Sequence, residues 1–286
     1  MNDNSYPLVS IYIPTRNRSE LLSRAILSVI NQSYENIEVV VCSDGSTDDT
    51  DLVISKLQRK YPGKIKYLKH ASSKGACKAR NNAILNSSGD YITGLDDDDY
   101  FTESHIMSLY SFLISTGQQV VFPRHKIKKE DIKDKPQISN IVDVESLMNG
   151  NIVGNQIFCN REIFLKAGLF DEKLPALQDY ELWLRVVNLV GQLKQNPEPS
   201  YIVDVSHAHE RITKSPIKVS AAVDHILDKH IDLFSNGKKC LILATKYKYS
   251  GQKLLTKEFL SDLVLKNPKL GLKVLLKRFL RKIDAI

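Results

Sequence analysis

Residues 91–99 read YITGLDDDD, an apolar run followed at once by four consecutive aspartates, Asp96 to Asp99. The apolar part predicts a short buried strand, because it is rich in β-forming residues and follows the turn pair Ser88-Gly89. Four adjacent negative charges repel one another and are costly unless a positive group is bound among them. A solvated acidic loop is the alternative, but a position at the carboxyl end of a strand favours a ligand site.

A divalent cation that binds together with a phosphate-bearing ligand would neutralise these aspartates. Hard oxygen ligands suit Mg²⁺ or Mn²⁺, and Mg²⁺ is usually held by one or two carboxylates plus substrate phosphates. The acidic run therefore predicts a joint site for a metal ion and a nucleotide.

The residues before this run alternate between strand and helix patterns. Apolar runs predict strands over 8–13, 37–42, 65–68 and 91–95, with helices beginning near residues 19, 50 and 75. Ser19 is expected to cap the first helix, and Pro14 to end the first strand. Such alternation implies right-handed crossovers and a parallel sheet. The turns after residues 13 and 42 then open on the same edge as the aspartates.

Five pieces of the first hundred residues carry a resemblance. They are SIYIPTRNR (10–18), SVINQSY (28–34), SDGSTDDT (43–50), GACKARN (75–81) and GDYITGLDDDD (89–99). In order and spacing they resemble the family 2 glycosyltransferases. The resemblance implies a GT-A fold, which is an α/β fold with a Rossmann-like, mostly parallel sheet flanked by helices. It also implies an inverting transferase of the hexosyltransferase type that uses a nucleotide-sugar, usually UDP-linked, with Mn²⁺ or Mg²⁺.

The resemblance further implies the residues that surround the nucleotide. In the family, the aspartate of the Asp-Gly-Ser turn contacts the base, the turn after the first strand flanks base and ribose, and the arginine of the Ala-Arg-Asn piece approaches the nucleotide. The implied nucleotide-sugar residues are Pro14, Thr15, Arg16, Asp44, Arg80, Asp96 and Asp97. The plainer interpretation makes Asp44 a turn residue and Arg80 a solvated helix residue.

The Asp-x-Asp motif of the family matches Asp96 and Asp98, with Asp98 as the direct metal ligand. The doubled acids leave this register open by one position. Family members also carry a histidine near the metal or diphosphate, and His209 matches it better than His207. The alternative for either histidine is a structural role.

A candidate base lies in the second half, where GLFDE (168–172) is followed by QDYELWLR (178–185). This pair resembles the acidic motif that starts a helix in the family, with Asp179 at the position that deprotonates the acceptor hydroxyl. Gln178 replaces the usual first acid. Asp179 could instead only complement a helix dipole, Glu181 is a weaker alternative base, and Trp183 is either core or a sugar platform.

Composition sets the wider frame. The chain has 286 residues, a formal net charge of +7 and four scattered cysteines without metal-ligand spacing, which suggests reduced thiols and a cytoplasmic setting. Neither a signal peptide nor a membrane-spanning stretch is visible. Basic residues over 124–129 predict a solvated loop, and they do not interleave with aromatics in a nucleic-acid-binding motif.

Residues 269–283 form a basic amphipathic helix pattern. Such a helix would either lie on an anionic membrane surface or pack on its own domain. We expect a catalytic domain over 1–215 and a helical C-terminal region over 216–286. A peripheral position on the inner face of the membrane would suit a lipid-linked glycan acceptor, as in O-antigen or capsule synthesis by bacterial relatives.

Two other functions are compatible with these sequence features. A nucleotidyltransferase acting on sugar phosphates also needs carboxylates, a metal and a nucleotide, although no Gly-rich phosphate loop is present. A non-catalytic sugar-nucleotide binding module would keep Asp44 and the acidic run without needing Asp179. A dinucleotide oxidoreductase is disfavoured, because no Gly-x-Gly-x-x-Gly follows the first strand. The sugar, the nucleotide, the acceptor, the linkage and the oligomeric state are not determined by the sequence.

Overall fold

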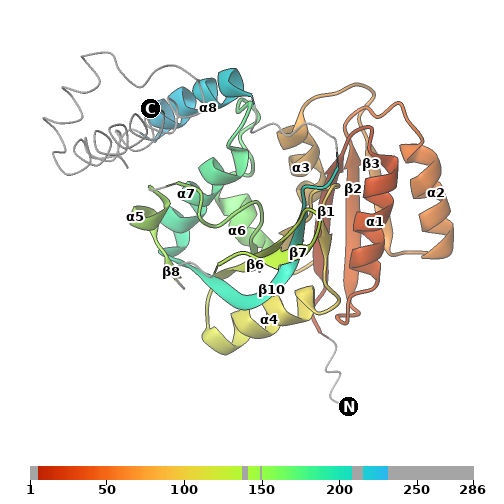
Figure 1. The fold of residues 1–286 in the computed structure, drawn as a ribbon, viewed down its shortest axis with the longest axis horizontal. Helices are drawn as coiled ribbons and strands as arrows, with labels where there is room; N and C mark the ends of the chain where they lie inside the picture. Colours follow the sequence, from red (N-terminus) through yellow and green to blue (C-terminus); the bar gives the residue numbers. More distant parts are fainter. Residues whose placement is uncertain (1–5, 137–140, 149, 208–214, 231–286) are drawn as a thin grey trace, which may run out of the picture. The chain divides into compact units, whose positions relative to one another are not determined.

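The computed structural model describes residues 6–136, 141–148, 150–207 and 215–230 (Figure 1). The strands are β1 Val9–Thr15, β2 Ile37–Ser43, β3 Ile65–Lys69, β4 Tyr91–Gly94, β5 Tyr100–Phe101, β6 Val120–Lys128, β7 Ile132–Asp134, β8 Ile141–Val142, β9 Phe158–Asn160 and β10 Leu193–Asp204. The helices are α1 Ser19–Ile30, α2 Thr50–Lys60, α3 Ala76–Leu85, α4 His105–Thr116, α5 Val144–Leu147, α6 Arg161–Lys166, α7 Gln178–Val190 and α8 Pro216–Lys229.

The central sheet has the strand order β3-β2-β1-β4-β9-β6-β10-β5. The first four of these strands are parallel, with β1 between β2 and β4. Beyond β4 the sheet is mixed, because β9 runs antiparallel to both β4 and β6 while β10 runs parallel to β6. The predicted Rossmann-like α/β architecture is confirmed. It brings the ends of β1, β2 and β4 together at one edge, which we call the carboxyl edge.

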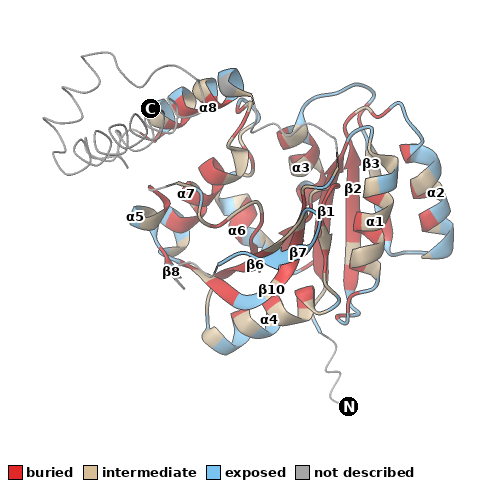
Figure 2. Ribbon diagram, in the orientation of Figure 1, coloured by how far each residue is buried: buried red, intermediate tan, exposed pale blue. Residues whose placement is uncertain are grey.

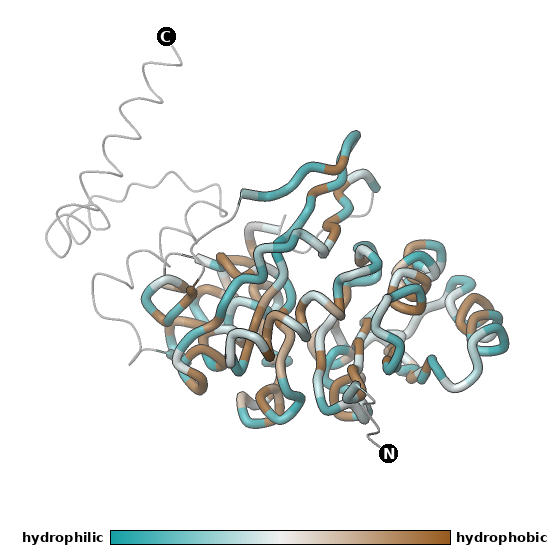
Figure 3. The backbone as a smooth tube through the Cα atoms, turned by 90° about the horizontal axis from the view of Figure 1, so that it is seen from below, coloured by the Kyte–Doolittle hydropathy of each residue, from teal (hydrophilic) through white to brown (hydrophobic). Residues whose placement is uncertain are grey.

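Helices cover both faces of the sheet, so β1 is buried throughout (Figure 2). Ile11 and Ile13 pack in the cluster that holds the apolar faces of α1, α2 and α4. Tyr12 points to the opposite face, where its ring lies 5.9 Å from that of Phe164 on α6. The period of two along a strand produces this division. The surrounding helices alternate between hydrophilic and hydrophobic residues along the chain, as one-sided burial requires (Figure 3).

Two local expectations at the start of the chain are wrong. The first strand continues through Pro14 to Thr15, with Pro14 opposite Cys42 of β2. The last pair between β1 and β4 is Tyr12 with Gly94, so the missing N–H of Pro14 costs no ladder bond to β4. Ser19 is the first helical residue rather than the cap, and its N–H donates to the Asp48 carboxylate at 3.0 Å. The side chain of Asp48, which is distant in the sequence, therefore caps this end of the helix.

The basic stretch 124–129 is also not a loop. Most of it extends β6, which pairs with β10 on one side and with the short strand β7 on the other. Its partner β10 is a long strand that ends at Asp204.

The chain divides into two compact units. The first comprises residues 1–147, 151–173 and 178–209, and the second comprises 148–150, 174–177 and 210–286. In the second unit α8 buries four apolar residues and leaves Ile217 82% exposed. Among the described residues, no helix is both long and apolar enough to cross a membrane. The boundary at residue 215 stays a prediction, and the amphipathic tail 269–283 lies outside the described residues.

Candidate active site

The acidic run follows β4 directly and lies at the carboxyl edge beside the end of β1. Thr15, the last residue of β1, donates its hydroxyl to Asp97 Oδ2 at 2.7 Å. The run is folded into a turn in which the Asp99 N–H donates to the Asp96 carbonyl at 3.0 Å. The structure therefore brings Thr15 into contact with the aspartates, at the sheet edge that the sequence predicts for this turn.

Two arginines balance much of the negative charge. Arg18 Nη1 lies 2.9 Å from Asp97 Oδ1 and 3.1 Å from Asp98 Oδ2. Arg80 on α3 donates to Asp96 Oδ1 at 3.0 Å. Arg80 therefore lies beside the acidic run, and so does Arg18, which the sequence pattern does not single out, whereas Arg16 is exposed. Arg18 is the residue before α1. The sequence does not show which of the two arginines faces the acidic run, because that depends on the direction in which α1 leaves the sheet.

Burial changes the protonation of two aspartates in the run. Burial raises the pKa of Asp97 to about 6, although Arg18 and the Thr15 hydroxyl act in the opposite direction. Burial also raises the pKa of Asp99 well above its usual range, and the charges of Asp96 and Asp98 add to this effect. Ionisation of both carboxyl groups is thus unfavourable in the protein alone, and a bound cation would favour their charged forms.

Sequence reasoning missed a second set of partners, which comes from residues 155–201. Asn155 Nδ2 lies 3.0 Å from Asp96 Oδ2, 3.3 Å from Asp99 Oδ2 and 2.8 Å from the Tyr201 hydroxyl. The Asp96 N–H also donates to the Tyr201 hydroxyl at 3.3 Å. No local pattern marks these polar groups, because they reach the run only through the pairing of β9, β6 and β10.

Asp44 follows β2 at the same edge, but its own chain saturates its carboxylate. It accepts from His70 Nδ1 (2.9 Å), the Ser73 hydroxyl (2.7 Å), the Lys74 N–H (2.7 Å) and the Gly75 N–H (2.9 Å). Burial raises the pKa of Asp44, but these hydrogen bonds outweigh it and hold the pKa below its usual value. A nucleotide base would have to replace one of the donors, since a carboxylate has about four acceptor positions.

Gly45 allows this tight turn. Its φ of +70° is in the left-handed region, and a Cβ there would lie 2.6 Å from the Ser73 backbone nitrogen. No other residue type would leave room for the 72–75 loop to reach Asp44.

Asp179 lies in the first turn of α7, and its Oδ2 accepts from Asn151 Nδ2 at 2.8 Å. Burial raises its pKa, while the Tyr180 N–H and the charge of Arg80 lower it and the charge of Asp96 raises it further. The residue is therefore close enough to the acidic run to respond to its charge. A carboxylate with a raised pKa at a polar edge has the chemistry of a general base.

The neighbours of Asp179 on α7 are structural. Glu181 is fully buried and forms a salt bridge with Arg185, with an Oε2–Nη2 distance of 2.6 Å. That pairing removes it as an alternative base. Trp183 is also fully buried, packs against Phe164 and Phe170, and donates Nε1–H to the Gly154 carbonyl at 2.9 Å. Trp183 therefore belongs to the core, as one of the two interpretations predicts.

The donor set fits a magnesium-type ion that binds together with phosphates. In the described part of the chain, no group of three or more His, Cys, Asp or Glu residues is placed to hold a metal. Asp98 and Asp96 would supply one or two carboxylate ligands, and the rest would come from water and a diphosphate. His207 Nε2 lies 3.3 Å from Asp98 Oδ2. His209, the predicted metal ligand, lies outside the described residues.

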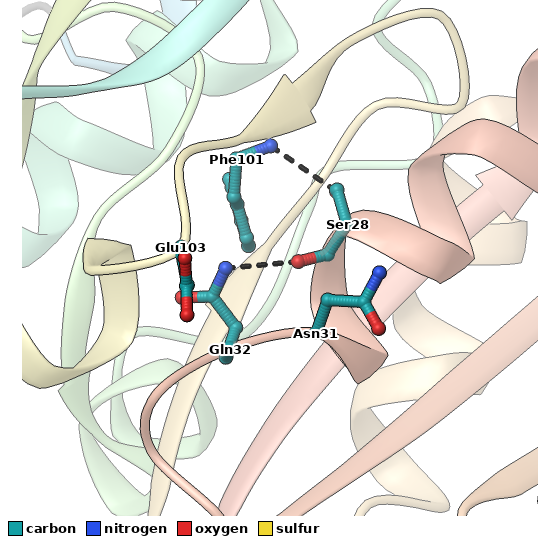
Figure 4. A pocket seen from close by; sticks show the side chains of 5 residues that line it. All are labelled: Ser28, Asn31, Gln32, Phe101 and Glu103. Atoms are coloured by element: carbon teal, nitrogen blue, oxygen red, sulfur yellow. Dashed lines mark hydrogen bonds between the residues drawn. The ribbon is translucent and has the colours of Figure 1, made fainter.

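A pocket of about 530 Å³ opens elsewhere on the first unit and is lined by Ser28, Asn31, Gln32, Phe101 and Glu103 (Figure 4). It lies at the carboxyl end of α1, whereas the acidic run contacts Arg18 at the start of that helix. None of the residues that line this pocket belongs to the acidic run, although Phe101 follows the run by two positions.

Comparison with known proteins agrees with this geometry. The family model described as glycosyl transferase family 2 matches residues 10–170. WcaA of Escherichia coli (strain K12), named as a glycosyl transferase of colanic acid biosynthesis, is 33% identical over 92% of this chain and 95% of its own. WfaP of Escherichia coli is named as a UDP-Glc:alpha-D-GlcNAc-diphosphoundecaprenol beta-1,3-glucosyltransferase. It is 29% identical over 63% of this chain and 70% of its own.

Solved structures share the fold at low sequence identity. TarS of S. aureus in complex with UDP-GlcNAc superposes with a TM-score of 0.68 and 16% identity, covering 90% of this chain and 78% of that one. The mannosyltransferase PcManGT of Pyrobaculum calidifontis, in complex with GDP-Man and Mn²⁺, gives 0.61 and 16%, covering 85% and 70%. At this identity they show the GT-A fold alone. The family match favours a glycosyltransferase over the nucleotidyltransferase and the non-catalytic module. The chain is a glycosyltransferase and belongs to glycosyl transferase family 2.

Proposed function

We propose that this glycosyltransferase transfers a sugar with inversion from a UDP-sugar to a hydroxyl group of a lipid-linked glycan. The observation that carries the proposal is the proximity of Asp179 to Arg80 and to Asp96 of the acidic run, whose charges act on its pKa. A direct displacement needs one carboxylate to take the acceptor's proton and positive charge to stabilise the departing diphosphate. Asp179 fills the first role, and the residues around Asp98 fill the second.

Asp98, Asp96 and His209 would hold the divalent ion, either Mn²⁺ or Mg²⁺. When bound, such an ion acts as a Lewis acid that neutralises charge on the leaving diphosphate. Arg18 and Arg80 hold the aspartates in place until then, through their contacts with Asp97, Asp98 and Asp96. Asp44, Pro14, Thr15, Arg16, Arg80, Asp96 and Asp97 remain the proposed contacts to the nucleotide-sugar.

The choice of donor and acceptor is supported by the relatives. The TarS complex contains UDP-GlcNAc, and the name of WfaP specifies UDP-Glc as donor and a diphosphoundecaprenol-linked sugar as acceptor. WcaA is named for the synthesis of colanic acid. These names support a UDP-sugar, a lipid-linked acceptor and a place in the assembly of a bacterial surface polysaccharide. A peripheral position on the inner membrane face would bring the enzyme to such an acceptor.

The donor is tested with a panel of UDP-, GDP- and dTDP-sugars, each added with and without Mn²⁺ or Mg²⁺. A ligand that binds only the native state raises its stability by mass action, so the correct donor should raise the melting temperature in a metal-dependent way. The chosen donor is then incubated with a lipid-diphosphate-linked sugar, and the anomeric configuration of the product is read by NMR. A product with retained configuration, or a panel in which no UDP-sugar binds, would overturn the proposal.

A further inference from the structure

A short segment, residues 151–155 (NIVGN), connects the proposed base with the acidic run. At its start, Asn151 Nδ2 donates to Asp179 Oδ2 at 2.8 Å. At its end, Asn155 Nδ2 donates to Asp96 Oδ2 at 3.0 Å. Two carboxylates that are far apart in the sequence are thus held by two amides from one segment.

The segment is held in a fixed conformation by its own turn and by α7. Asn151 Oδ1 accepts from the Gly154 N–H at 3.0 Å, and Asn151 Nδ2 also donates to the Gly154 carbonyl at 2.9 Å. Trp183 Nε1 donates to the same carbonyl at 2.9 Å. Asp179 and Trp183 are one helical turn apart and share a face of α7. That face therefore binds the segment at two points.

Gly154 allows β6 to approach the segment closely. Its φ is +94°, and a Cβ at this position would lie 2.4 Å from His125 Cε1. His125 Nε2 in turn lies 3.1 Å from Asn155 Oδ1. The segment is consequently fixed by β6 as well as by α7, and its conformation requires glycine.

The amide of Asn151 is suited to control a base. A donor on one carboxylate oxygen orients the group and favours its charged form, which is the form that accepts a proton. Asn151 is itself exposed, so its hydrogen bond contributes little to folding compared with a buried one. An exposed amide placed on a functional carboxylate therefore has a clearer role in catalysis than in stability.

We propose that Asn151 is a positioning residue for Asp179, and that the segment 151–155 fixes the placement of the base relative to the acidic run. The inference rests on the proposed function, in which Asp179 accepts the acceptor's proton. The charged groups that act on Asp179 are Arg80 on α3 and Asp96 after β4. Asn151 is the neutral side chain that donates a hydrogen bond to it.

Two substitutions of Asn151 test the role of the amide. Asn151→Asp keeps the shape and an oxygen for the Gly154 N–H, but it replaces the donor with a negative charge. The acidic limb of the pH profile of kcat/KM should move up by about one pH unit or more, as for paired carboxylates. Asn151→Ala should lower kcat by about 10- to 100-fold through misplacement of the base. The KM for the donor should change by less than about twofold, because the substrate-binding groups are retained.

A matched pair of glycine substitutions tests the segment. Gly154→Ala should lower kcat by at least about tenfold, since the new Cβ would collide with His125. Gly191 also has a left-handed φ, of +85°, but open space around it. Gly191→Ala should bear the same backbone strain and keep the wild-type kcat. Circular dichroism and the melting temperature check the fold of each variant, and the isosteric Asn151→Asp decides if Asn151→Ala does not fold.

The outcomes separate this inference from the proposed function. If Asp179→Asn is inactive while both Asn151 variants keep the wild-type rate and pH profile, the positioning role is wrong and the base assignment stands. If Asp179→Asn keeps full activity, the base assignment is wrong and the role of Asn151 falls with it. A shifted acidic limb in Asn151→Asp together with a low kcat in Asn151→Ala supports the inference.

Discussion

Two turns at the carboxyl edge carry buried aspartates whose pKa values are shifted in opposite directions. Asp44, after β2, accepts four hydrogen bonds from its own chain, which hold its pKa below the usual value. Asp97 and Asp99, after β4, have pKa values raised by burial. The carboxylate of the first turn is stabilised in its charged form by its own chain, whereas the carboxyl groups of the second turn are ionised less readily. A cation is therefore expected to stabilise the charged form more in the second turn than in the first.

The largest effect is expected from removing Asp98, the proposed direct metal ligand in the second turn. Asp98→Asn should lower metal-dependent turnover by about 10³-fold or more, since a bound ion contributes several kcal/mol to the transition state. The measurement is the release of nucleotide diphosphate as a function of Mn²⁺ or Mg²⁺ concentration. Wild-type turnover in both Asp98→Asn and Asp96→Asn would remove the metal site from the second turn.

A smaller loss of activity is expected at the base. Asp179→Asn should lower kcat by about 10²–10⁴-fold, the usual contribution of a general base, with little change in donor affinity. Single-turnover kinetics and calorimetric titration with UDP separate the two quantities. Weakened UDP binding with an unchanged chemical step would place Asp179 with the nucleotide contacts instead.

At the first turn we expect a loss of stability. Asp44→Asn should lower the free energy of unfolding by about 2–3 kcal/mol, because several donors that now meet a charged acceptor would face an amide N–H₂ group. Urea denaturation measures this change. Asp51 provides the control, since its side chain is 54% exposed and its salt bridge with Lys69 lies on the surface. Asp51→Asn should lower the free energy of unfolding by less than about 1 kcal/mol. Equal losses in both variants would show that the buried hydrogen bonds of Asp44 contribute no more than a surface salt bridge.

The pH dependence of stability should differ in sign between the turns. The folded pKa of Asp97 is about 6, above its ordinary value of 3.8, so between these values the native state binds more protons than the unfolded state. Its contribution therefore makes the free energy of unfolding fall as pH rises from about 4 to 6, by at most about 1.4 kcal/mol per unit. Asp44 acts oppositely: its contribution is present above the unfolded pKa and is lost as pH falls through the lower folded pKa.

Denaturation series in EDTA between pH 3 and 7 check this contrast. Asp97→Asn should flatten the slope between pH 4 and 6 in part, since Asp99 acts in the same sense. Asp44→Asn should leave that slope unchanged and remove the stability that the wild type gains as pH rises toward the ordinary aspartate pKa of 3.8. Identical slopes in the wild type and Asp97→Asn would show that folding does not raise the pKa of Asp97.

The smallest effect concerns the membrane. A chain that ends at Asn267 should keep its catalytic rate on a soluble acceptor, while full-length protein should float with anionic liposomes and detach as salt rises. Each basic residue near an anionic surface contributes about 1 kcal/mol, and this attraction is screened over about 8–10 Å at physiological ionic strength. Equal flotation of both chains would show that the tail does not attach the protein to the membrane and would favour its packing on its own domain.

Local sequence pattern is sufficient to place the first parallel strands and the acidic run at their carboxyl edge. The apolar runs over 8–13, 37–42 and 65–68 mark β1 to β3, because burial on both faces of a parallel strand requires continuous apolar sequence. The strand-end positions of Thr15, Asp44 and Asp96 to Asp99 follow from the same alternation, since parallel strands end at one edge. These are consequences of local periodicity, which is visible in one chain.

Tertiary structure alone decided which partners meet the aspartates. Arg18 rather than Arg16 contacts the acidic run because α1 leaves β1 in a particular direction. Asn155 reaches Asp96 across 59 positions of sequence, and Asn151 reaches Asp179 across 28, because β9 and α7 bring these segments together. An isolated asparagine carries no periodic or charge signal. Long-range hydrogen bonds depend on the register and crossing of whole elements, and that information appears only when the chain is folded.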